Sequence, residues 1–190
     1  MSQESEDNFK VDLTKCHTDW DIQTKIKRGV WQFLVRPIYR LIPFGMSGLR
    51  VAILKLFGAK IGQHCNIQQR VEILIPWNLD LGDHVALAHD VKILNFSKVT
   101  IGSMSIVSQY TYLCTGTHDT SDPHFTLIHR PITIESEAWI ASGAFIGLGV
   151  TIGRGSVIGA NSVVTKDTAE WMIYAGNPCS ALKKREINRN

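Results

Sequence analysis

Residues 134–165 read IESEAWIASGAFIGLGVTIGRGSVIGANSVVT, and an aliphatic side chain stands at every sixth position of this stretch. The recurring positions are Ile134, Ile140, Ile146, Ile152, Ile158 and Val164. An α-helix repeats every 3.6 residues and a β-strand every 2, so neither explains a period of six. The period predicts a parallel β-helix, in which each six-residue unit forms one flat side of a coil and its aliphatic residue fills the interior.

The same register extends back through the chain, with short slips between coils. The earlier aliphatic positions are Ile61, Ile67, Ile73, Leu81, Leu87, Ile93, Ile101, Val107 and Leu113. The next position in register is Ile134, so about fifteen residues leave the coil after His118. Long excursions from a compact scaffold tend to carry function. We predict an all-β domain, a β-helix over residues 61–167 with a loop over residues 119–131.

The composition is that of one soluble globular domain, with 44% apolar and 19% charged residues in a chain of 190. The uncharged stretch 138–153 is too short and too rich in glycine to span a bilayer, and the acidic first residues do not form a signal peptide. The four cysteines lack CxxC spacing, which indicates reduced thiols and a cytoplasmic protein. We expect no nucleic-acid partner.

Charge is unevenly distributed at the front of the chain. Residues 1–21 carry six acidic and two basic residues, whereas residues 22–60 carry eight basic residues and no acidic one. We predict a disordered acidic tail over residues 1–21. Within residues 22–60, apolar residues at helical spacing predict two short amphipathic helices, one ending before Pro37 and the other before Gly58.

Two interpretations of this basic helical segment remain open. It can be a cap, because the open end of a β-helix exposes apolar core and unpaired strand edges. It can also be a peripheral contact with an anionic membrane surface, near a lipid-linked acceptor. The two are compatible, since the polar face of a capping helix stays free.

Four short segments resemble one family of enzymes. They are LCTGTHD at 113–119, AWIASG at 138–143, VVTKD at 163–167 and AGNP at 175–178. Together with the hexads they are similar to the hexapeptide-repeat acyltransferases. Over residues 45–187 the chain is most similar to the sugar O-acetyltransferases of the maltose and galactoside type and to the acetyltransferases of exopolysaccharide (colanic acid) clusters. The hexads alone indicate only a fold, whereas the combination indicates an acyltransferase.

The resemblance implies a left-handed β-helix assembled as a homotrimer, with acetyl-CoA bound between neighbouring subunits. Handedness does not follow from the period and depends on the resemblance alone. The implied reaction transfers an acetyl group from acetyl-CoA to a saccharide hydroxyl in surface polysaccharide biosynthesis. Two alternatives stay open, namely N-acetyl transfer to an amino sugar or small amine, and a non-catalytic β-helix scaffold.

The transfer needs a base because a sugar hydroxyl is a poor nucleophile, and the candidate is His118. An imidazole can accept a proton near neutral pH, and a positioned base contributes about 10² to 10⁴ in rate. By the register, His118 is the last residue before the chain leaves the coil. The resemblance implies the catalytic role, and without it a polar corner residue would be the better interpretation.

The resemblance also implies residues that contact acetyl-CoA. The backbone amide of Ser142 would stabilise the negative charge that develops on the thioester oxygen. Trp139 would lie against the cofactor, with packing at a subunit interface as its alternative role. Gly143 and Ala160 match positions where small side chains let the pantetheine arm run along the coil.

The nucleotide end of coenzyme A has candidate contacts near the C-terminus. Thr165 and Lys166 match the family's contacts there. In the C-terminal segment 168–190, the basic run KKR at 183–185 follows at a distance that could reach the 3′-phosphate. We expect Lys166 and Lys183 to bind this phosphate, although a basic tail is often merely solvated.

For binding of the acceptor, the resemblance gives one candidate residue. Asn95 resembles the asparagine that faces the sugar in the galactoside-type enzymes. The chain lacks the longer hairpin that accompanies it there, and basic helices replace the usual N-terminal region. Both departures favour a nucleotide-linked or lipid-linked sugar over a free disaccharide.

A zinc site needs three ligands from neighbouring strands. His124 and His129 are five residues apart, and His89 precedes His124 by thirty-five, a spacing close to that of the β-helical carbonic anhydrases. The two later histidines fall inside the predicted excursion rather than on a coil. We therefore expect no metal.

Overall fold

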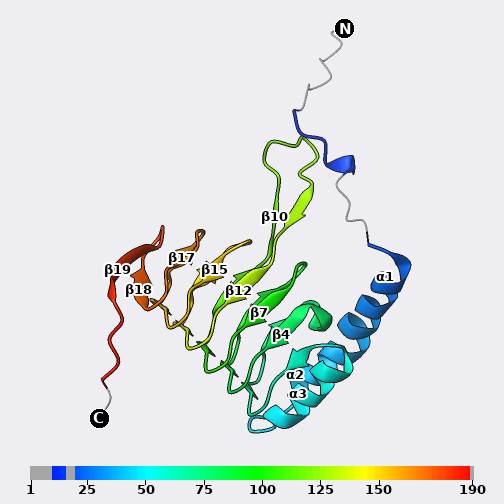
Figure 1. Cartoon of the computed structure of the whole chain (residues 1–190). Coiled ribbons are helices and arrows are strands. Elements are labelled where there is room, and N and C mark those ends of the chain that lie inside the picture. Colours follow the sequence, from blue (N-terminus) through cyan, green and yellow to red (C-terminus); the bar gives the residue numbers. More distant parts are fainter. Residues whose placement is uncertain (1–9, 16–19, 189–190) are drawn as a thin grey trace.

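The computed structural model describes residues 10–15 and 20–188, and its main body is a parallel β-helix with three flat faces (Figure 1). Face A contains β1 (Lys60–Ile61), β4 (Leu79–Leu81), β7 (Val99–Ile101), β12 (Ile132–Ile134) and β15 (Thr151–Ile152). Face B contains β2 (Asn66–Ile67), β5 (Ala86–Leu87), β8 (Ile106–Val107), β13 (Trp139–Ile140), β16 (Val157–Ile158), β18 (Met172–Ala175) and β19 (Ser180–Lys184). Face C contains β3 (Glu72–Ile73), β6 (Lys92–Leu94), β9 (Tyr112–Cys114), β14 (Phe145–Ile146) and β17 (Val163–Val164).

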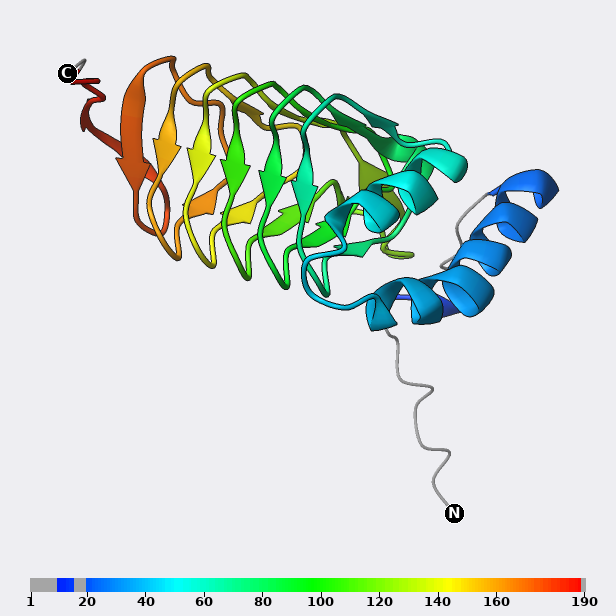
Figure 2. The same ribbon diagram turned by 90° about the horizontal axis from the view of Figure 1, so that it is seen from below.

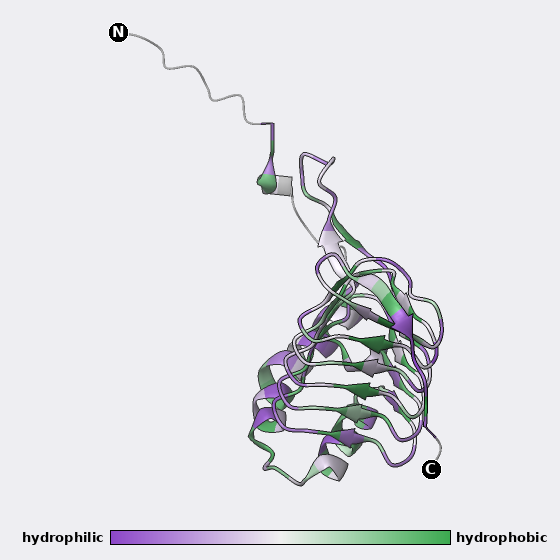
Figure 3. Cartoon of the chain, turned by 90° about the vertical axis from the view of Figure 1, so that its left-hand side faces the viewer, coloured by the Kyte–Doolittle hydropathy of each residue, from purple (hydrophilic) through white to green (hydrophobic). Residues whose placement is uncertain are grey.

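The strand pairing confirms the predicted six-residue register. On face A, Ile101 pairs with Leu81 on one side and with Ile134 on the other. The aliphatic residues of the other two faces stack from coil to coil in the same way, and Figure 3 shows the resulting apolar rows along the strands. All fifteen predicted interior residues are at most 8% exposed. The β-helix core is therefore a stack of aliphatic layers.

An N-terminal helical region covers the first coil (Figure 2). It consists of α1 (Ile22–Gly29), the π-helical turn η2 (Val30–Val35), α2 (Arg36–Leu41) and α3 (Ser47–Leu56). Trp31 is fully buried, and its Nε1–H donates to the carbonyl oxygen of Ile73 at 2.9 Å. Since this contact joins the helices to the open end of the β-helix, the cap interpretation has direct structural support.

The first helix does not end before Pro37, contrary to the prediction. Proline lacks an N–H and its ring crowds the preceding turn, which disfavours a regular α-helix there. Here the chain widens into η2, where the N–H of Arg36 donates to the carbonyl oxygen of Trp31. Pro37 then lies in the first turn of α2, where a missing N–H costs little. One curved helical segment therefore runs from Ile22 to Leu41.

The segment expected to be a disordered tail is partly ordered. A short 3₁₀ turn, η1 (Leu13–Lys15), follows Asp12, whose N–H donates to the carbonyl oxygen of Pro123 at 2.8 Å. The prediction is therefore wrong for residues 10–15, which contact the excursion. Residues 1–9 and 16–19, to which it also applied, lie outside the described residues.

The excursion is a β-hairpin rather than an irregular loop. Strands β10 (Gly116–His118) and β11 (Leu127–His129) pair antiparallel, with His118 opposite Leu127. The chain therefore leaves the coil before His118, not after it. The register could not show this, because a strand outside the coil continues the extended backbone of the strand before it.

Candidate active site

The predicted site residues lie on two edges and one face of the β-helix, with Trp139 in β13 and Lys183 in β19 on face B. The hairpin with His118 leaves from the edge between faces C and A, and Lys166 follows β17 on that same edge. Ser142 and Ala160 lie in turns at the edge between faces B and C. The whole width of face C separates the two groups, so a single chain does not bring His118 and Ser142 together.

His118 is exposed and held by one backbone contact. Its Nδ1 lies 2.5 Å from the carbonyl oxygen of Phe125, further along the hairpin. A carbonyl oxygen can only accept a hydrogen bond, so Nδ1 carries the hydrogen in the neutral ring. The unprotonated nitrogen is then Nε2, and its lone pair is the one a general base needs.

Within the described residues, the group that orients His118 is a carbonyl and not a carboxylate. The adjacent carboxylate, that of Asp119, instead accepts hydrogen bonds from the hydroxyl and the N–H of Ser121 at 2.6 and 2.9 Å. These bonds, the hydroxyl bond first, lower the pKa of Asp119. Asp119 therefore shapes the hairpin turn.

Ser142 and Gly143 form the turn between β13 and β14. The N–H of Ser142 donates to no acceptor within the described part of the chain, so it is available to an oxygen outside it. Gly143 has φ +70°, and a Cβ added there would lie 2.2 Å from Oδ1 of Asn161. The packing of the turn alone therefore requires glycine at position 143, independently of any contact with pantetheine.

The remaining predicted contacts are accessible. Trp139 is 46% exposed on face B, and its Nε1–H donates to the hydroxyl of Ser108 at 3.0 Å. Ala160 and Thr165 are exposed in their turns, as are the side chains of Lys166 and Lys183. An outward indole and free lysines can contact a ligand or a neighbouring subunit.

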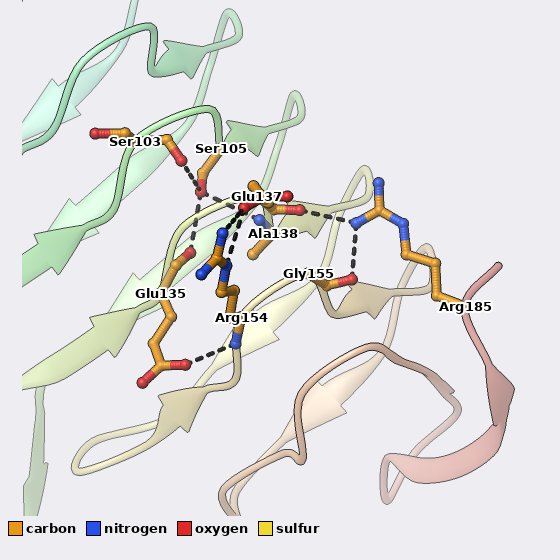
Figure 4. A network of polar contacts seen from close by, with 8 residues as sticks. All are labelled: Ser103, Ser105, Glu135, Glu137, Ala138, Arg154, Gly155 and Arg185. Carbon is orange, nitrogen blue, oxygen red and sulfur yellow. Dashed lines mark hydrogen bonds and ion pairs between the residues drawn. The ribbon is translucent and has the colours of Figure 1, made fainter. Parts of the chain in front are cut away.

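Arg185 uses one nitrogen of its guanidinium to bond backbone oxygens. Its guanidinium NH1 donates to the carbonyl oxygens of Glu137 and Gly155 at 2.8 and 2.7 Å (Figure 4). The neighbouring turns are themselves joined, because the guanidinium of Arg154 pairs with the carboxylate of Glu137. NH1 of Arg185 therefore fastens the chain after β19 to two turns, and the contact of the basic run with the 3′-phosphate stays a prediction.

The expected acceptor contact of Asn95 is also contradicted. The side chain is fully buried, its Oδ1 accepts from the N–H of Ile75 at 2.9 Å, and its Nδ2 donates to the carbonyl oxygen of the same residue at 2.7 Å. With both ends of the amide bonded to backbone, nothing remains for a sugar. Asn95 instead joins two successive coils where the chain bends between faces C and A.

An aromatic groove that the sequence did not predict lies beside the hairpin. Trp20, Trp77, Phe96 and His129 line it, together with the polar side chains of Asp21, Thr24 and Asn78. The ring of Trp20 meets that of Phe96 edge to face at 6.1 Å, and Phe96 stacks with His129 at 6.4 Å. These residues are as far as 109 positions apart, so no local spacing pattern could have revealed the groove.

The histidines considered for zinc have other partners. Nδ1 of His129 lies 2.6 Å from the hydroxyl of Ser97, and Nδ1 of His124 lies 2.9 Å from the carbonyl oxygen of Asp12. Across residues 10–15 and 20–188, no three His, Cys, Asp or Glu side chains are grouped so that they could hold a metal ion.

The chain is similar to known acetyltransferases both in sequence and in fold. Residues 131–166 match the family model described as bacterial transferase hexapeptide (six repeats). The chain is 39% identical over 160 residues to an Escherichia coli K12 protein named "Putative colanic acid biosynthesis acetyltransferase WcaF", covering 84% of this chain and 88% of that one.

Two solved structures are similar over most of the chain. A maltose O-acetyltransferase from Clostridium difficile 630 superposes with a TM-score of 0.80 at 28% identity, covering 88% of this chain and 90% of that one. A hexapeptide-repeat acetyltransferase from Vibrio cholerae in complex with acetyl-CoA gives 0.81 at 25% identity, covering 90% and 94%.

The molecule is thus a β-helical acyltransferase. More specifically, the chain belongs to the hexapeptide-repeat acetyltransferase family, as the sequence motifs predicted.

Proposed function

We propose that the chain is an O-acetyltransferase that transfers the acetyl group of acetyl-CoA to a saccharide hydroxyl, with His118 as general base. The observation that carries this proposal is the contact of His118 with Phe125, which leaves Nε2 unprotonated on an exposed hairpin. The likeness to the colanic acid relative supports an acceptor that belongs to surface polysaccharide biosynthesis. In this proposal the enzyme works in the cytoplasm.

In this mechanism Nε2 of His118 takes the proton of the hydroxyl while the hydroxyl oxygen forms its bond to the thioester carbonyl carbon. The N–H of Ser142 donates to the carbonyl oxygen as negative charge develops on it. The C–S bond then breaks, and His118 returns the proton to the departing coenzyme A sulfur. The hydroxyl proton thus ends on the coenzyme A thiol, the acetyl group ends on the hydroxyl oxygen, and His118 is neutral again.

The site requires more than one copy of the chain. Because His118 and Ser142 lie on opposite edges of face C, one thioester can reach both only if they belong to different subunits. A closed ring of three copies, the assembly that the family resemblance implies, would supply such a pairing three times. Sedimentation equilibrium should give three copies, and a fully active monomer would contradict this arrangement.

In the trimer, coenzyme A runs from the edge between faces B and C toward the C-terminal end of the β-helix. Trp139, Gly143 and Ala160 contact the pantetheine arm in this proposal. Thr165 and Lys166 reach the nucleotide. Lys183 lies in β19 on face B, away from Lys166, so in this proposal the two lysines reach one 3′-phosphate from different subunits. Their exposure supports these roles.

The aromatic groove is the proposed acceptor site. Aromatic rings present flat apolar faces on which the C–H faces of a sugar can pack, and the polar side chains of Asp21 and Asn78 can bond its hydroxyls. A Cβ on Gly116 would point at the ring of Phe96, 2.7 Å away. His118 stands two residues further along the same strand and therefore on the same side of it.

The decisive experiment replaces His118 by Ala and measures acetyl transfer from labelled acetyl-CoA to a panel of nucleotide-linked sugars, lipid-linked sugars and oligosaccharides. Transfer should slow at least about a hundredfold, while calorimetry should find coenzyme A binding unchanged. His84→Ala, at an exposed turn stacked on His64, is the matched control. Unchanged turnover in the His118 variant would refute the base assignment.

Two alternative functions are separated by the same assay. An N-acetyl product from an amino sugar or small amine would show a different acceptor on the same machinery. A scaffold would transfer nothing to any acceptor in the panel and would be indifferent to His118. Trp77→Ala should raise the KM for the acceptor without changing the affinity for coenzyme A, which tests the groove separately.

A further inference from the structure

A stripe of exposed apolar side chains follows one side of the helical segment between Ile22 and Leu41. Its members are Ile22, Ile26, Val30, Phe33, Leu34, Ile38 and Leu41, and each is between 39% and 81% exposed. Spacings of three and four residues place them on one helix face, which we call the apolar stripe. The exposed side chains of Phe44 and Leu56 extend the apolar surface beyond this helix.

The opposite side of the same helical segment is the one that packs on the β-helix. Trp31 and Tyr39 are buried there, and Trp31 contacts the ring of Phe57 at 5.1 Å. The apolar stripe, whose side chains are exposed, therefore faces away from the β-helix. A surface of this length is larger than the scattered apolar residues of an ordinary monomer, which indicates a binding surface.

The positive charge of the N-terminal helical region indicates which kind of surface the stripe binds. Residues 22–60 contain eight basic residues and no acidic one. Two of these cations, Arg36 and Arg40, pair with Glu72 of the β-helix. Lys25, Lys55 and Lys60 are exposed, and no carboxylate among the described residues pairs with them.

We propose that the apolar stripe, together with the exposed lysines of residues 22–60, docks this enzyme on an anionic membrane surface. A helix that combines a wide apolar face with basic residues and no acidic ones lies in the interface of such a membrane, its apolar side chains among the acyl chains and its cations at the headgroups. None of the helices in the described residues is long and apolar enough to cross a bilayer, so the contact is peripheral.

Docking would also place the aromatic groove beside the lipid headgroups. Trp20, Asp21 and Thr24 line that groove at the start of the same helical segment. A saccharide carried on a lipid would then reach the groove without leaving the membrane. This consequence alone rests on the proposed function, whereas the docking does not.

Vesicle flotation of the full chain tests the docking. The probes are vesicles of phosphatidylglycerol and phosphatidylcholine in equal amounts, and vesicles of phosphatidylcholine alone. The protein should float with the anionic vesicles at low salt, and binding should fall steeply with added salt because the Debye length shrinks. A protein that stays at the bottom of the gradient with both kinds of vesicle overturns the proposal.

Two sets of variants test whether the apolar stripe makes the contact with the membrane. The triple variant Phe33→Ser, Leu34→Ser and Leu41→Ser should bind anionic vesicles at least about tenfold more weakly, because each side chain loses apolar burial. The matched control is Met104→Ser, Leu182→Ser and Ile187→Ser, three exposed apolar residues outside the helices. Equal flotation of the triple variant and the wild type contradicts the assignment.

Replacing Lys25 and Lys55 by Gln should weaken the binding about fivefold for each cation removed. The same changes at Lys92 and Arg130, exposed outside the helices, should have little effect. Light scattering of every variant distinguishes the other possible occupant, a second copy of the chain. If the stripe variant changes the number of subunits while the wild type ignores vesicles, the stripe is a subunit interface and the membrane proposal fails.

Discussion

Nδ1 of His118 donates a hydrogen bond to the carbonyl oxygen of Phe125 at 2.5 Å, across the hairpin that leaves the β-helix. A backbone carbonyl thus fixes the tautomer and the orientation of this ring, as a carboxylate does in well-known histidine bases. Because the carbonyl is neutral, it directs the proton to Nδ1 without adding a charge beside the imidazole.

This contact predicts the tautomer of His118 in solution. In the neutral ring, nitrogen-detected NMR should assign the proton to Nδ1, whereas the other tautomer usually dominates for a free histidine. The exposed His84, whose ring stacks on His64, gives the comparison spectrum. A proton found on Nε2 of His118 would remove the structural basis of the base assignment.

The pair of lysines predicts a selective loss of affinity. Changing Lys166 and Lys183 to Ala should weaken coenzyme A about tenfold or more, but dephospho-coenzyme A only slightly, because only the former carries a 3′-phosphate. Lys60→Ala, at an exposed strand position at the opposite end of the β-helix, is the control. Equal weakening of both ligands in calorimetry would place these lysines elsewhere.

Gly143→Ala should destabilise the fold. At φ +70° a side chain is strained, and the new Cβ would collide with Asn161, so we expect a loss of about 1 to 3 kcal/mol and a fall in Tm of several degrees. Gly48→Ala, within α3 and with nothing inside 4 Å of the added Cβ, should instead raise Tm slightly. Thermal unfolding of both variants checks the pair, and an unchanged Tm for Gly143→Ala would contradict the packing argument.

Acidification should weaken a link between two coils. Arg70 donates to both carboxylate oxygens of Asp90 at 2.8 and 2.7 Å, and these contacts, with His89 as a lesser contributor, hold the pKa of Asp90 well below its usual range. A carboxyl with a depressed pKa in the folded state stabilises it at neutral pH, and this contribution is lost as the pH falls below about 4.

Asp90→Asn should therefore lower Tm at pH 7, and the gap to the wild type should narrow below about pH 4. Arg70→Gln should give the same pattern, since it removes the other partner of the ion pair. Thermal scans across this pH range measure both variants, and a Tm gap that does not change with pH would contradict a contribution from the charge of Asp90.

The interior of the β-helix could be predicted from the sequence because it depends on a local repeat. Each of Ile101, Ile134 and Ile152 occupies the same place in its own hexad, so the period alone decides which side chains point inward. The motif around His118 likewise lies in one short segment, and its resemblance to a family needs no long-range information.

Contacts between segments that are distant in the sequence could not be predicted from the repeat or from short motifs. Asn95 looks like a sugar ligand in its own segment, but it is buried because the backbone of Ile75 lies beside it. Arg50 counts as one more basic residue of the helical segment, yet it is only 1% exposed and donates to carbonyl oxygens such as that of Ile42. In both cases a hydrogen-bonding partner brought near by folding makes burial of a polar group favourable.

The sequence by itself therefore determined the β-helical coil, its register and the family. The coil and the register follow from the six-residue repeat, and the family follows from short sequence motifs. Only the tertiary structure decided that the excursion is a hairpin, that Trp20 and Phe96 form a groove, and that His118 and Ser142 lie on separate edges. The physical reason is that a six-residue period fixes which way a side chain points within its coil. It carries no information about which remote segment folds against it.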